Sequence, residues 1–382
     1  MSDHAGRGRT EGGFSVIRAG VVQDGGAHAQ AGAAHFSPSA LLRPPIVIHS
    51  ARAHRMTVPA ISVIILNHNG REWLPRCLAA VAAQRGAPPF ETIVVDNGSS
   101  DGSPALVRAQ YPDVLLIETG RNLGYTGGNN EGARAARGGW LAFLNNDTGA
   151  APDWLGRLHA AALAHPGHAL ITSRIVLMDA PQTLDSAGDG YLRAGGAFKR
   201  GHGAPAIEFE QSQEVFGACG AAFMIRRAVF EELEGFDESF FAVYEDVDLS
   251  YRARLRGYGC WYAADAIVRH AGGATLGVRS PSAVFHGQRN LEWTWIQNTP
   301  WPAIITTAPA HVVYSLAGLA HYARSGLAGP AVRGKIAALR GLPEALRARR
   351  RIQAARKVSD RQLAPLMHRA WLTLKRREKR AR

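Results

Sequence analysis

Short apolar runs alternate with helical segments through the first half of this chain, and this alternation constrains the fold more than any other feature. Residues 61–66 (ISVIIL) are uninterrupted apolar or small residues rich in branched side chains, which is typical of a strand buried on both faces of a parallel sheet. Similar runs occupy 91–95, 114–118 and 140–144, and segments of helical spacing occupy 73–84, 104–110 and 129–137. The pattern predicts an α/β fold with a doubly wound sheet.

Polar residues follow these runs at the points where the predicted strands end. Asn67 ends the first strand, Asp96 and Asn97 the second, and Asn145 and Asp147 the fourth. In open α/β sheets, ligands bind at the carboxyl ends of the strands. Asp96 is therefore suited to accept hydrogen bonds from a base or ribose, and the alternative for its segment DNGSSDGS is a surface turn.

A glycine-rich segment, RNLGYTGGNNEG, spans residues 121–132. Gly127 and Gly128 would let the backbone approach a ligand closely, and Asn129 is predicted to open the next helix, whose free N–H groups favour an anion. No GK[ST] follows, so the segment is not a P-loop.

The segment FLNNDTGAAPDWL (143–155) delivers one acid, Asp147, from an apolar strand into a loop. This arrangement is expected for a metal that carries a diphosphate, because Mg²⁺ and Mn²⁺ bind few protein oxygens and keep positions open for phosphate. The alternative is an Asx turn at the strand end.

The segment VYEDVDLSYR (243–252) places Glu245, Asp246 and Asp248 at the head of a predicted helix. Closely spaced carboxylates push one another's pKa values apart and are costly unless cations or hydrogen bonds offset them. Taken alone, the segment is equally compatible with a structural role, in which Asp246 caps the helix and Asp248 pairs with Arg252 at i, i+4.

Seven motifs occur in order between residues 61 and 270: SVIILNHNG, VVDNGSSDGS, NLGYTGGNN, FLNNDT, GACGAAFMIRR, GFDESFFAVYEDVDLSYRARLRGY and VRHAGGAT. In these motifs the chain resembles the family-2 glycosyltransferases of GT-A fold, particularly their rhamnosyltransferase-like branch. The resemblance implies a GT-A doubly wound mixed sheet, followed here by a C-terminal helical extension.

The resemblance also implies roles for individual residues. Asp246 would be the catalytic base, with Glu245 and Arg252 holding its loop and helix. Asp147 takes the last position of the family's DxD-type motif and His270 a position that supplies a further ligand, so the expected cofactor is Mn²⁺ or Mg²⁺. The nucleotide-sugar site would comprise Asn67, Asp96, Asn97, Asn122, Gly127, Gly128, Asn129 and Asn145.

Two features of the metal motif leave room for another interpretation. Asn145 stands where the family's commoner pattern has a first acid, which leaves a single carboxylate. The alternative for His270 is a histidine that binds no metal.

The implied activity is inverting transfer of a sugar from dTDP-rhamnose or a UDP-sugar to a hydroxyl of a cell-surface glycan or lipid-linked acceptor. Two other classes are a catalytically inactive glycan-binding domain, and a membrane- or nucleic-acid-binding protein that acts through a basic tail. The joint presence of Asp246, Asp147 and His270 argues against the inactive domain.

The formal net charge of +13 is concentrated near the ends of the chain. Residues 347–382 contain 14 Lys or Arg and two acids. We predict a disordered N-terminal stretch (1–55) upstream of a natural start at Met56, a catalytic domain (56–277), a helical region (278–345) and a basic tail (346–382). Three cysteines without CxxC spacing indicate buried thiols in a reducing cytoplasm: Cys77, Cys219 and Cys260.

Tryptophans flank an apolar run at 303–320 that contains Pro309 and His311. These two residues make it a poor spanning helix, so we predict an interfacial helix at an anionic membrane surface, with a cytoplasmic protein at the inner face of the cell membrane. The alternative is a helix packed on the catalytic domain beside a solvated tail. The tail contains no nucleic-acid-binding module, and its interleaved apolar residues favour a membrane over a specific nucleic acid.

Overall fold

The computed structural model of the protein describes residues 46–49, 58–272 and 280–369. These residues lie within one compact unit, Pro44–Arg382. The predicted start at Met56, most of the N-terminal stretch and the end of the basic tail lie outside the described residues.

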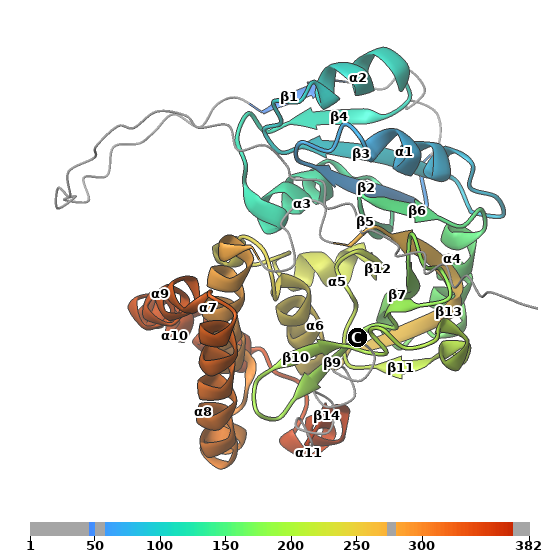
Figure 1. Ribbon diagram of the computed structural model, residues 1–382. Coiled ribbons are helices and arrows are strands. Elements are labelled where there is room, and N and C mark those ends of the chain that lie inside the picture. Colours follow the sequence, from blue (N-terminus) through green and yellow to red (C-terminus); the bar gives the residue numbers. More distant parts are fainter. Residues whose placement is uncertain (1–45, 50–57, 273–279, 370–382) are drawn as a thin grey trace, which may run out of the picture. The chain divides into compact units, whose positions relative to one another are not determined.

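A mixed sheet runs through this unit in the order β1-β4-β3-β2-β5-β12-β7-β13-β11 (Figure 1). Its strands are β1 (Val47–His49), β2 (Ile61–Asn67), β3 (Phe90–Asp96), β4 (Leu115–Glu118), β5 (Trp140–Asn145), β7 (His168–Leu177), β11 (Gln213–Val215), β12 (Ala222–Arg226) and β13 (Gly259–His270). Strands β4, β3, β2 and β5 are mutually parallel, and β12 is antiparallel to both β5 and β7. The predicted doubly wound mixed sheet is confirmed.

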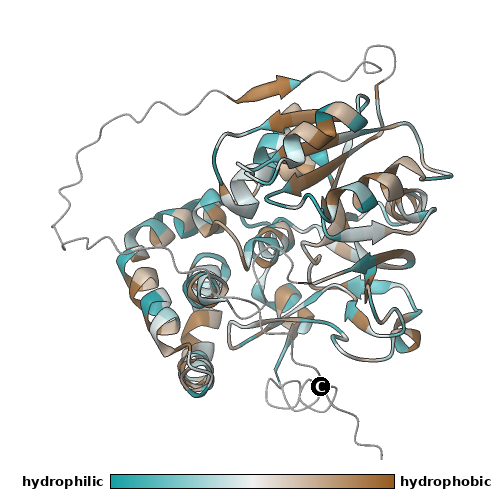
Figure 2. Cartoon of the chain, turned by 45° about the horizontal axis from the view of Figure 1, so that its top comes forward, coloured by the Kyte–Doolittle hydropathy of each residue, from teal (hydrophilic) through white to brown (hydrophobic). Residues whose placement is uncertain are grey.

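Helices cover both faces of this sheet because side chains alternate along its strands. Ile61, Val63 and Ile65 of β2 pack with residues of α1 (Leu74–Ala82), α2 (Ser103–Gln110) and α4 (Trp154–Ala164). Ile64 points the other way and packs with residues of α3 (Gly124–Ala135), α5 (Arg227–Glu232) and α6 (Glu245–Leu255). Figure 2 shows several of the central strands in brown, as expected for strands buried on both faces.

Two predicted boundaries are wrong. The third helix begins at Gly124, five residues before the predicted start, so Asn129 lies inside the helix. Residues 47–49, predicted to be disordered, form β1, which pairs antiparallel with β4.

A short second sheet follows β7. Its strands are β9 (Asp189–Leu192), β10 (Ala197–Lys199) and β14 (Met367–His368). Two further short strands belong to the large sheet: β8 (Leu184–Ser186) pairs with β7, and β6 (Thr148–Ala150) pairs with β13. Strand β14 returns from the C-terminal region to pair with β9.

The C-terminal region is helical, as predicted for 278–345, and the helices continue into the predicted basic tail. It contains α7 (Pro281–Asn298), α8 (Trp301–Arg324), α9 (Ala328–Arg340), α10 (Leu342–Ala354) and the short α11 (Asp360–Leu363). Among the described residues, α8 is the one helix long and apolar enough to cross a membrane by length and composition.

Candidate functional site

Asn67 and Asp96 end neighbouring parallel strands and form one polar network. The register of β2 and β3 sets them side by side. The Asn67 amide donates to Asp96 at 3.2 Å and to the Ser103 hydroxyl at 2.8 Å, and the backbone N–H of Ser99 donates to Asp96 at 3.1 Å. Both side chains are buried, so the network is fixed before any ligand arrives.

Asn97 and Asn122 join this network to the start of α3. The Asn97 amide donates to Asn122 Oδ1 at 3.0 Å, and Asn97 Oδ1 accepts the Leu123 N–H at 2.8 Å. Asn122 Oδ1 also accepts the N–H of Gly124 at 2.8 Å. The structure thus brings Asn67, Asp96, Asn97 and Asn122 together beside the ends of β2 and β3.

Three other residues of the predicted nucleotide-sugar site, Gly127, Gly128 and Asn129, make contacts within the protein. A Cβ at Gly127 would lie 2.8 Å from Leu123 Cβ, and one at Gly128 would lie 2.3 Å from Leu66 Cδ1, so both glycines allow close packing. The Asn129 amide donates to Tyr125 O in its own helix at 3.0 Å. The prediction that Asn129 opens the helix and offers free N–H groups is therefore wrong.

Asn145, which ends β5, is partly exposed, and its backbone N–H donates to Ala221 O at 2.9 Å. Its neighbour Asn146 is buried and donates to Asn67 Oδ1 at 2.9 Å. Asn146 was not among the predicted site residues. It is the same residue type as its neighbour Asn145, and only the structure shows which of the two faces the network.

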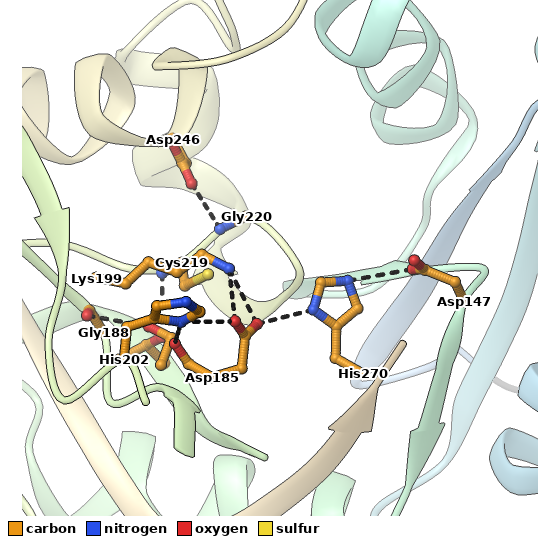
Figure 3. Close-up of polar contacts among 11 residues, drawn as sticks. Asp147, Asp185, Gly188, Lys199, His202, Cys219, Gly220, Asp246 and His270 are labelled. Carbon is orange, nitrogen blue, oxygen red and sulfur yellow. Dashed lines mark hydrogen bonds and ion pairs between the residues drawn. The ribbon is translucent and has the colours of Figure 1, made fainter. Parts of the chain in front are cut away.

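Asp147 and His270 meet because β6 pairs with the end of β13, which places His270 opposite Thr148. His270 Nε2 lies 3.3 Å from Asp147 Oδ1, and His270 Nδ1 lies 2.9 Å from Asp185 Oδ2 (Figure 3). All three side chains are buried. Burial alone would lower the pKa of His270, but its interactions with the carboxylates of Asp147 and Asp185 outweigh burial and raise the pKa to about 9.

Asp185 was not predicted from the sequence as a site residue, since its segment 185–203 indicates a loop, a lid or a short hairpin. The register of β8 against β7 shifts between Ile175 and Val176, so that Asp185 is the extra residue of a bulge, a feature that re-aims a side chain. Its carboxylate also binds Lys199 Nζ at 2.9 Å and His202 Nδ1 at 3.2 Å. Burial would raise the pKa of Asp185, but the hydrogen bonds from His202 and His270 and the charge of Lys199 hold it well below its usual value.

The pair Asp147 and His270 fits a cation held by few protein ligands. Asp147 Oδ1 is buried and makes no hydrogen bond, while Asp185 binds the other ring nitrogen of His270, as a carboxylate commonly does behind a metal-binding histidine. The described residues contain no group of three or more His, Cys, Asp or Glu that could hold a metal. Mg²⁺ and Mn²⁺ are cations that one or two protein ligands can hold together with phosphate and water.

Asp246, at the start of α6, faces Gly220. Its Oδ2 accepts the Gly220 N–H at 2.8 Å, and its Oδ1 accepts the Val247 N–H at 2.8 Å. A Cβ on Gly220 would lie 3.0 Å from Asp246 Oδ2 and 3.3 Å from the Tyr125 hydroxyl, so the glycine keeps space in front of the carboxylate. Asp246 is half-buried, unlike its buried neighbours in the helix.

Two further buried acids, Glu245 and Asp189, lie near Asp246. Burial, together with the charge of Asp246, raises the pKa of each well above its usual value. Burial also raises the pKa of Asp246, but two backbone N–H groups and the charge of Lys199 oppose that rise. The ionised form of Asp246 is thus supported by two backbone N–H groups and by the charge of Lys199.

The two predicted supporting residues, Arg252 and Glu245, differ in their contacts. Arg252 Nε binds Asp248 at 2.7 Å, which confirms the i, i+4 pair, and Arg252 Nη1 donates to Leu233 O. Glu245 Oε2 is buried without a hydrogen-bond partner, so this oxygen does not fasten the loop.

Comparison with known proteins relates part of this chain to a family. Residues 62–234 match the model of "Glycosyl transferase family 2". The chain is 29% identical over 234 residues to the N-acetylglucosaminyl-diphospho-decaprenol L-rhamnosyltransferase of Mycobacterium tuberculosis, an alignment that covers 55% of this chain and 75% of the relative. It is 39% identical over 102 residues to the succinoglycan biosynthesis protein ExoO of Rhizobium meliloti, covering 26% of this chain and 29% of that protein.

Among solved structures, the mannosyltransferase PcManGT of Pyrobaculum calidifontis, in complex with GDP-Man and Mn²⁺, aligns with a TM-score of 0.48 and 18% identity over 82% of this chain and 88% of that one. The chain thus spans less than a third of ExoO and three quarters of the mycobacterial relative. Residues 62–234 thus match glycosyl transferase family 2, and the chain is similar to proteins of that kind, among them an L-rhamnosyltransferase.

Proposed function

We propose that this protein is an inverting glycosyltransferase that moves a sugar from a nucleoside diphosphate donor to an acceptor hydroxyl, with Asp246 as the general base. The observation that carries the proposal is the environment of Asp246. Its carboxylate is half-buried, it accepts two backbone N–H groups, and the space before it is kept open by Gly220. A positioned carboxylate of this kind can take a proton from an attacking hydroxyl.

The proposed reaction is a single displacement. The acceptor oxygen attacks the anomeric carbon, its proton passes to Asp246, and the bond from the anomeric carbon to the diphosphate oxygen breaks with its electron pair on the leaving group. Attack opposite the leaving group inverts the anomeric centre. NMR of the product checks this step, and a product with the donor's own anomeric configuration would exclude it.

The nucleotide would lie at the carboxyl ends of β2 and β3, where Asn67, Asp96 and Asn97 are fixed by mutual hydrogen bonds. A divalent cation bound by Asp147 and His270 would neutralise charge on the leaving diphosphate. Asp185 holds Nδ1 of His270, which directs Nε2 toward Asp147. Turnover in EDTA equal to that with Mn²⁺ would reject the metal role.

For the substrates we propose dTDP-rhamnose as donor, with UDP-sugars as the competing class, and a lipid-linked saccharide or cell-surface glycan as acceptor. The name of the mycobacterial relative, an L-rhamnosyltransferase acting on a decaprenol-linked diphosphosugar, supports this choice. A donor panel assayed by nucleotide release tests it. Release from dTDP-rhamnose is expected to exceed that from any UDP-sugar, and the reverse order would reassign the donor.

An exposed apolar stripe on α8 supports attachment at a membrane surface. His311 is buried on one side of the helix, bound to Glu292 at 2.7 Å and to Ala194 O at 2.9 Å. The opposite side exposes large apolar side chains, namely Trp301, Ile305, Val312, Val313 and Leu316. Because the His311 contacts tie α8 to the globular part of the chain, we propose that it lies in the interface rather than across the bilayer.

Exposed basic residues at the end of α8 and on α9 favour an anionic lipid surface. Arg324 ends α8 and Arg333 and Arg340 lie on α9, and all three are exposed. Each cation near such a surface contributes about 1 kcal/mol. Flotation with anionic vesicles is expected at low salt, and a gel shift with nucleic acid in the absence of flotation would favour the nucleic-acid alternative.

A further inference from the structure

The backbone just before α6 is held in conformations that L-amino acids rarely adopt. Phe241 (φ 64, ψ −62), Val243 (φ 69) and Tyr244 (φ 77) all have positive φ and none is glycine. The N–H of Ala242 donates to Phe240 O at 2.7 Å, which closes a tight three-residue turn around Phe241. Each such residue costs on the order of 1–3 kcal/mol and persists only where the surroundings hold it.

Asn290 of α7 holds this turn. Its side chain is 0% exposed, and its Nδ2 lies 2.9 Å from Phe240 O, 2.9 Å from Ala242 O and 2.6 Å from Val243 O. Three carbonyl groups of the strained segment therefore converge on one amide. A relaxed segment could not keep all three oxygens at this nitrogen.

Arg289, the neighbour of Asn290, fixes the same segment and orients the amide. Its Nη2 lies 2.8 Å from both Ser239 O and Phe240 O, and its Nε donates to Asn290 Oδ1 at 2.9 Å. Because that oxygen accepts from the guanidinium, the amide nitrogen must face the carbonyl groups. The orientation of Asn290 thus follows from its partners.

The other side of the turn touches α3, next to the proposed donor site. The Thr126 N–H donates to Phe241 O at 3.2 Å. A Cβ at Gly124, which itself has φ +74, would lie 2.4 Å from Phe241 O. The turn is therefore held between the start of α3 and the side of α7, and it leads directly into the helix that carries Asp246.

We infer that Asn290, supported by Arg289, is a positioning residue for Asp246. It holds segment 240–244 in its strained form, and this form sets where α6 begins and keeps the Asp246 carboxylate at the Gly220 N–H. The inference rests on the proposed function, and it makes α7, which lies beyond the family domain at 62–234, part of the catalytic apparatus. A displacement of about 1 Å at a catalytic group can lower turnover by about 100-fold.

The test compares three variants of the full chain. Asn290→Leu removes the donor at nearly constant size, and Asn290→Ser keeps one donor. Gln288→Met is the matched control, because Gln288 is a buried amide of the same helix that contacts Gly318 and Gly334 of α8 and α9 instead of the turn. Hydrogen exchange of the peptide covering 240–248 and the kcat and KM of nucleotide release are measured for each.

In Asn290→Leu we expect amide exchange in 240–248 to rise about tenfold or more, and kcat to fall about 10- to 100-fold while donor KM changes less than about threefold. Asn290→Ser should lie between this variant and the native protein, and Gln288→Met should match the native protein.

If amide exchange in 240–248 were unchanged in both Asn290 variants, Asn290 would not hold the turn. If exchange were faster but kcat stayed native, Asn290 would not position Asp246. If Asn290→Leu does not fold, Asn290→Ser decides by the same criteria. A native protein that releases nucleotide from no donor would refute the proposed function, and the exchange comparison would still decide whether Asn290 holds the turn.

Discussion

Asp246 and Asp248 lie two residues apart on α6, yet the structure predicts very different losses of stability when each is changed to asparagine. Asp248 is 0% exposed, and its oxygens bind Arg252 Nε at 2.7 Å and Asn298 Nδ2 at 2.7 Å. Arg252 is 8% exposed, and its Nη2 has no hydrogen-bond partner. Asp248→Asn would leave this guanidinium buried opposite a neutral amide.

The magnitude follows from the burial of the pair. Removing one partner of a buried ion pair costs about 3–5 kcal/mol, and the retained amide oxygen places Asp248→Asn near the lower end, at about 3 kcal/mol. A loss of that size lowers Tm by about 5–10 °C in a domain of this size.

Asp246→Asn is the matched control for this loss. The Asp246 carboxylate binds two backbone N–H groups rather than a buried guanidinium, so Asp246→Asn leaves no buried cation opposite a neutral amide. The unfolding free energy at pH 7.5 should therefore stay within about 1 kcal/mol of the native value.

Urea unfolding followed by tryptophan fluorescence measures both variants. The double variant Asp248→Asn, Arg252→Met should recover part of the loss, because removing both partners leaves no unpaired charge. The reasoning would be refuted if Asp248→Asn were as stable as the native protein, or if Asp246→Asn were destabilised by the same amount.

Three further predictions concern the metal, the space before the base and the membrane. The pKa of His270 is raised to about 9, so below that pH a cation competes with the proton on Nε2. The affinity for Mn²⁺, measured by calorimetry, should rise by up to about tenfold per pH unit from pH 7 to 9 and then level off. An affinity that does not change with pH would contradict the role of His270 as a ligand. Gly220→Ala places a carbon 3.0 Å from Asp246 Oδ2, so kcat should fall about tenfold at native stability, and a native kcat would show that this space is not used. Ile305→Glu should reduce flotation with anionic vesicles about tenfold. Ile207 is equally exposed, at 72%, and Ile207→Glu should leave flotation unchanged. An equal loss in both variants would contradict α8 as the membrane-contacting surface.

The strands could be predicted from sequence because their signal is local. The apolar runs at 61–66 and 140–144 correspond to β2 and β5 to within one residue. The beginning of α3 could not be predicted in this way, since its glycine-rich first turns have low helix propensity. Its helix is stabilised by tertiary packing, in which Gly128 and Gly132 admit Leu66 and Ile64 of β2.

The candidate site was predictable only where its residues belong to strand ends or to a dense acidic segment. Asp147 and Asp246 meet that condition, whereas His270 was indicated only by the family resemblance. Asp185 and Asn290 do not meet it, because their positions depend on a bulge against β7 and on helix packing across the chain. No pattern local to either residue indicates these long-range contacts.

The turnover of Asp246→Asn tests the central claim most directly, since kcat reports the loss of the proposed base separately from any change in donor binding. Nucleotide release is measured with the best donor and saturating Mn²⁺, for the native chain and the variant, in the presence of an acceptor. We predict that kcat falls by about 10²–10⁴ while donor KM stays close to native. Equal turnover by the two proteins would contradict the assignment of Asp246 as the base.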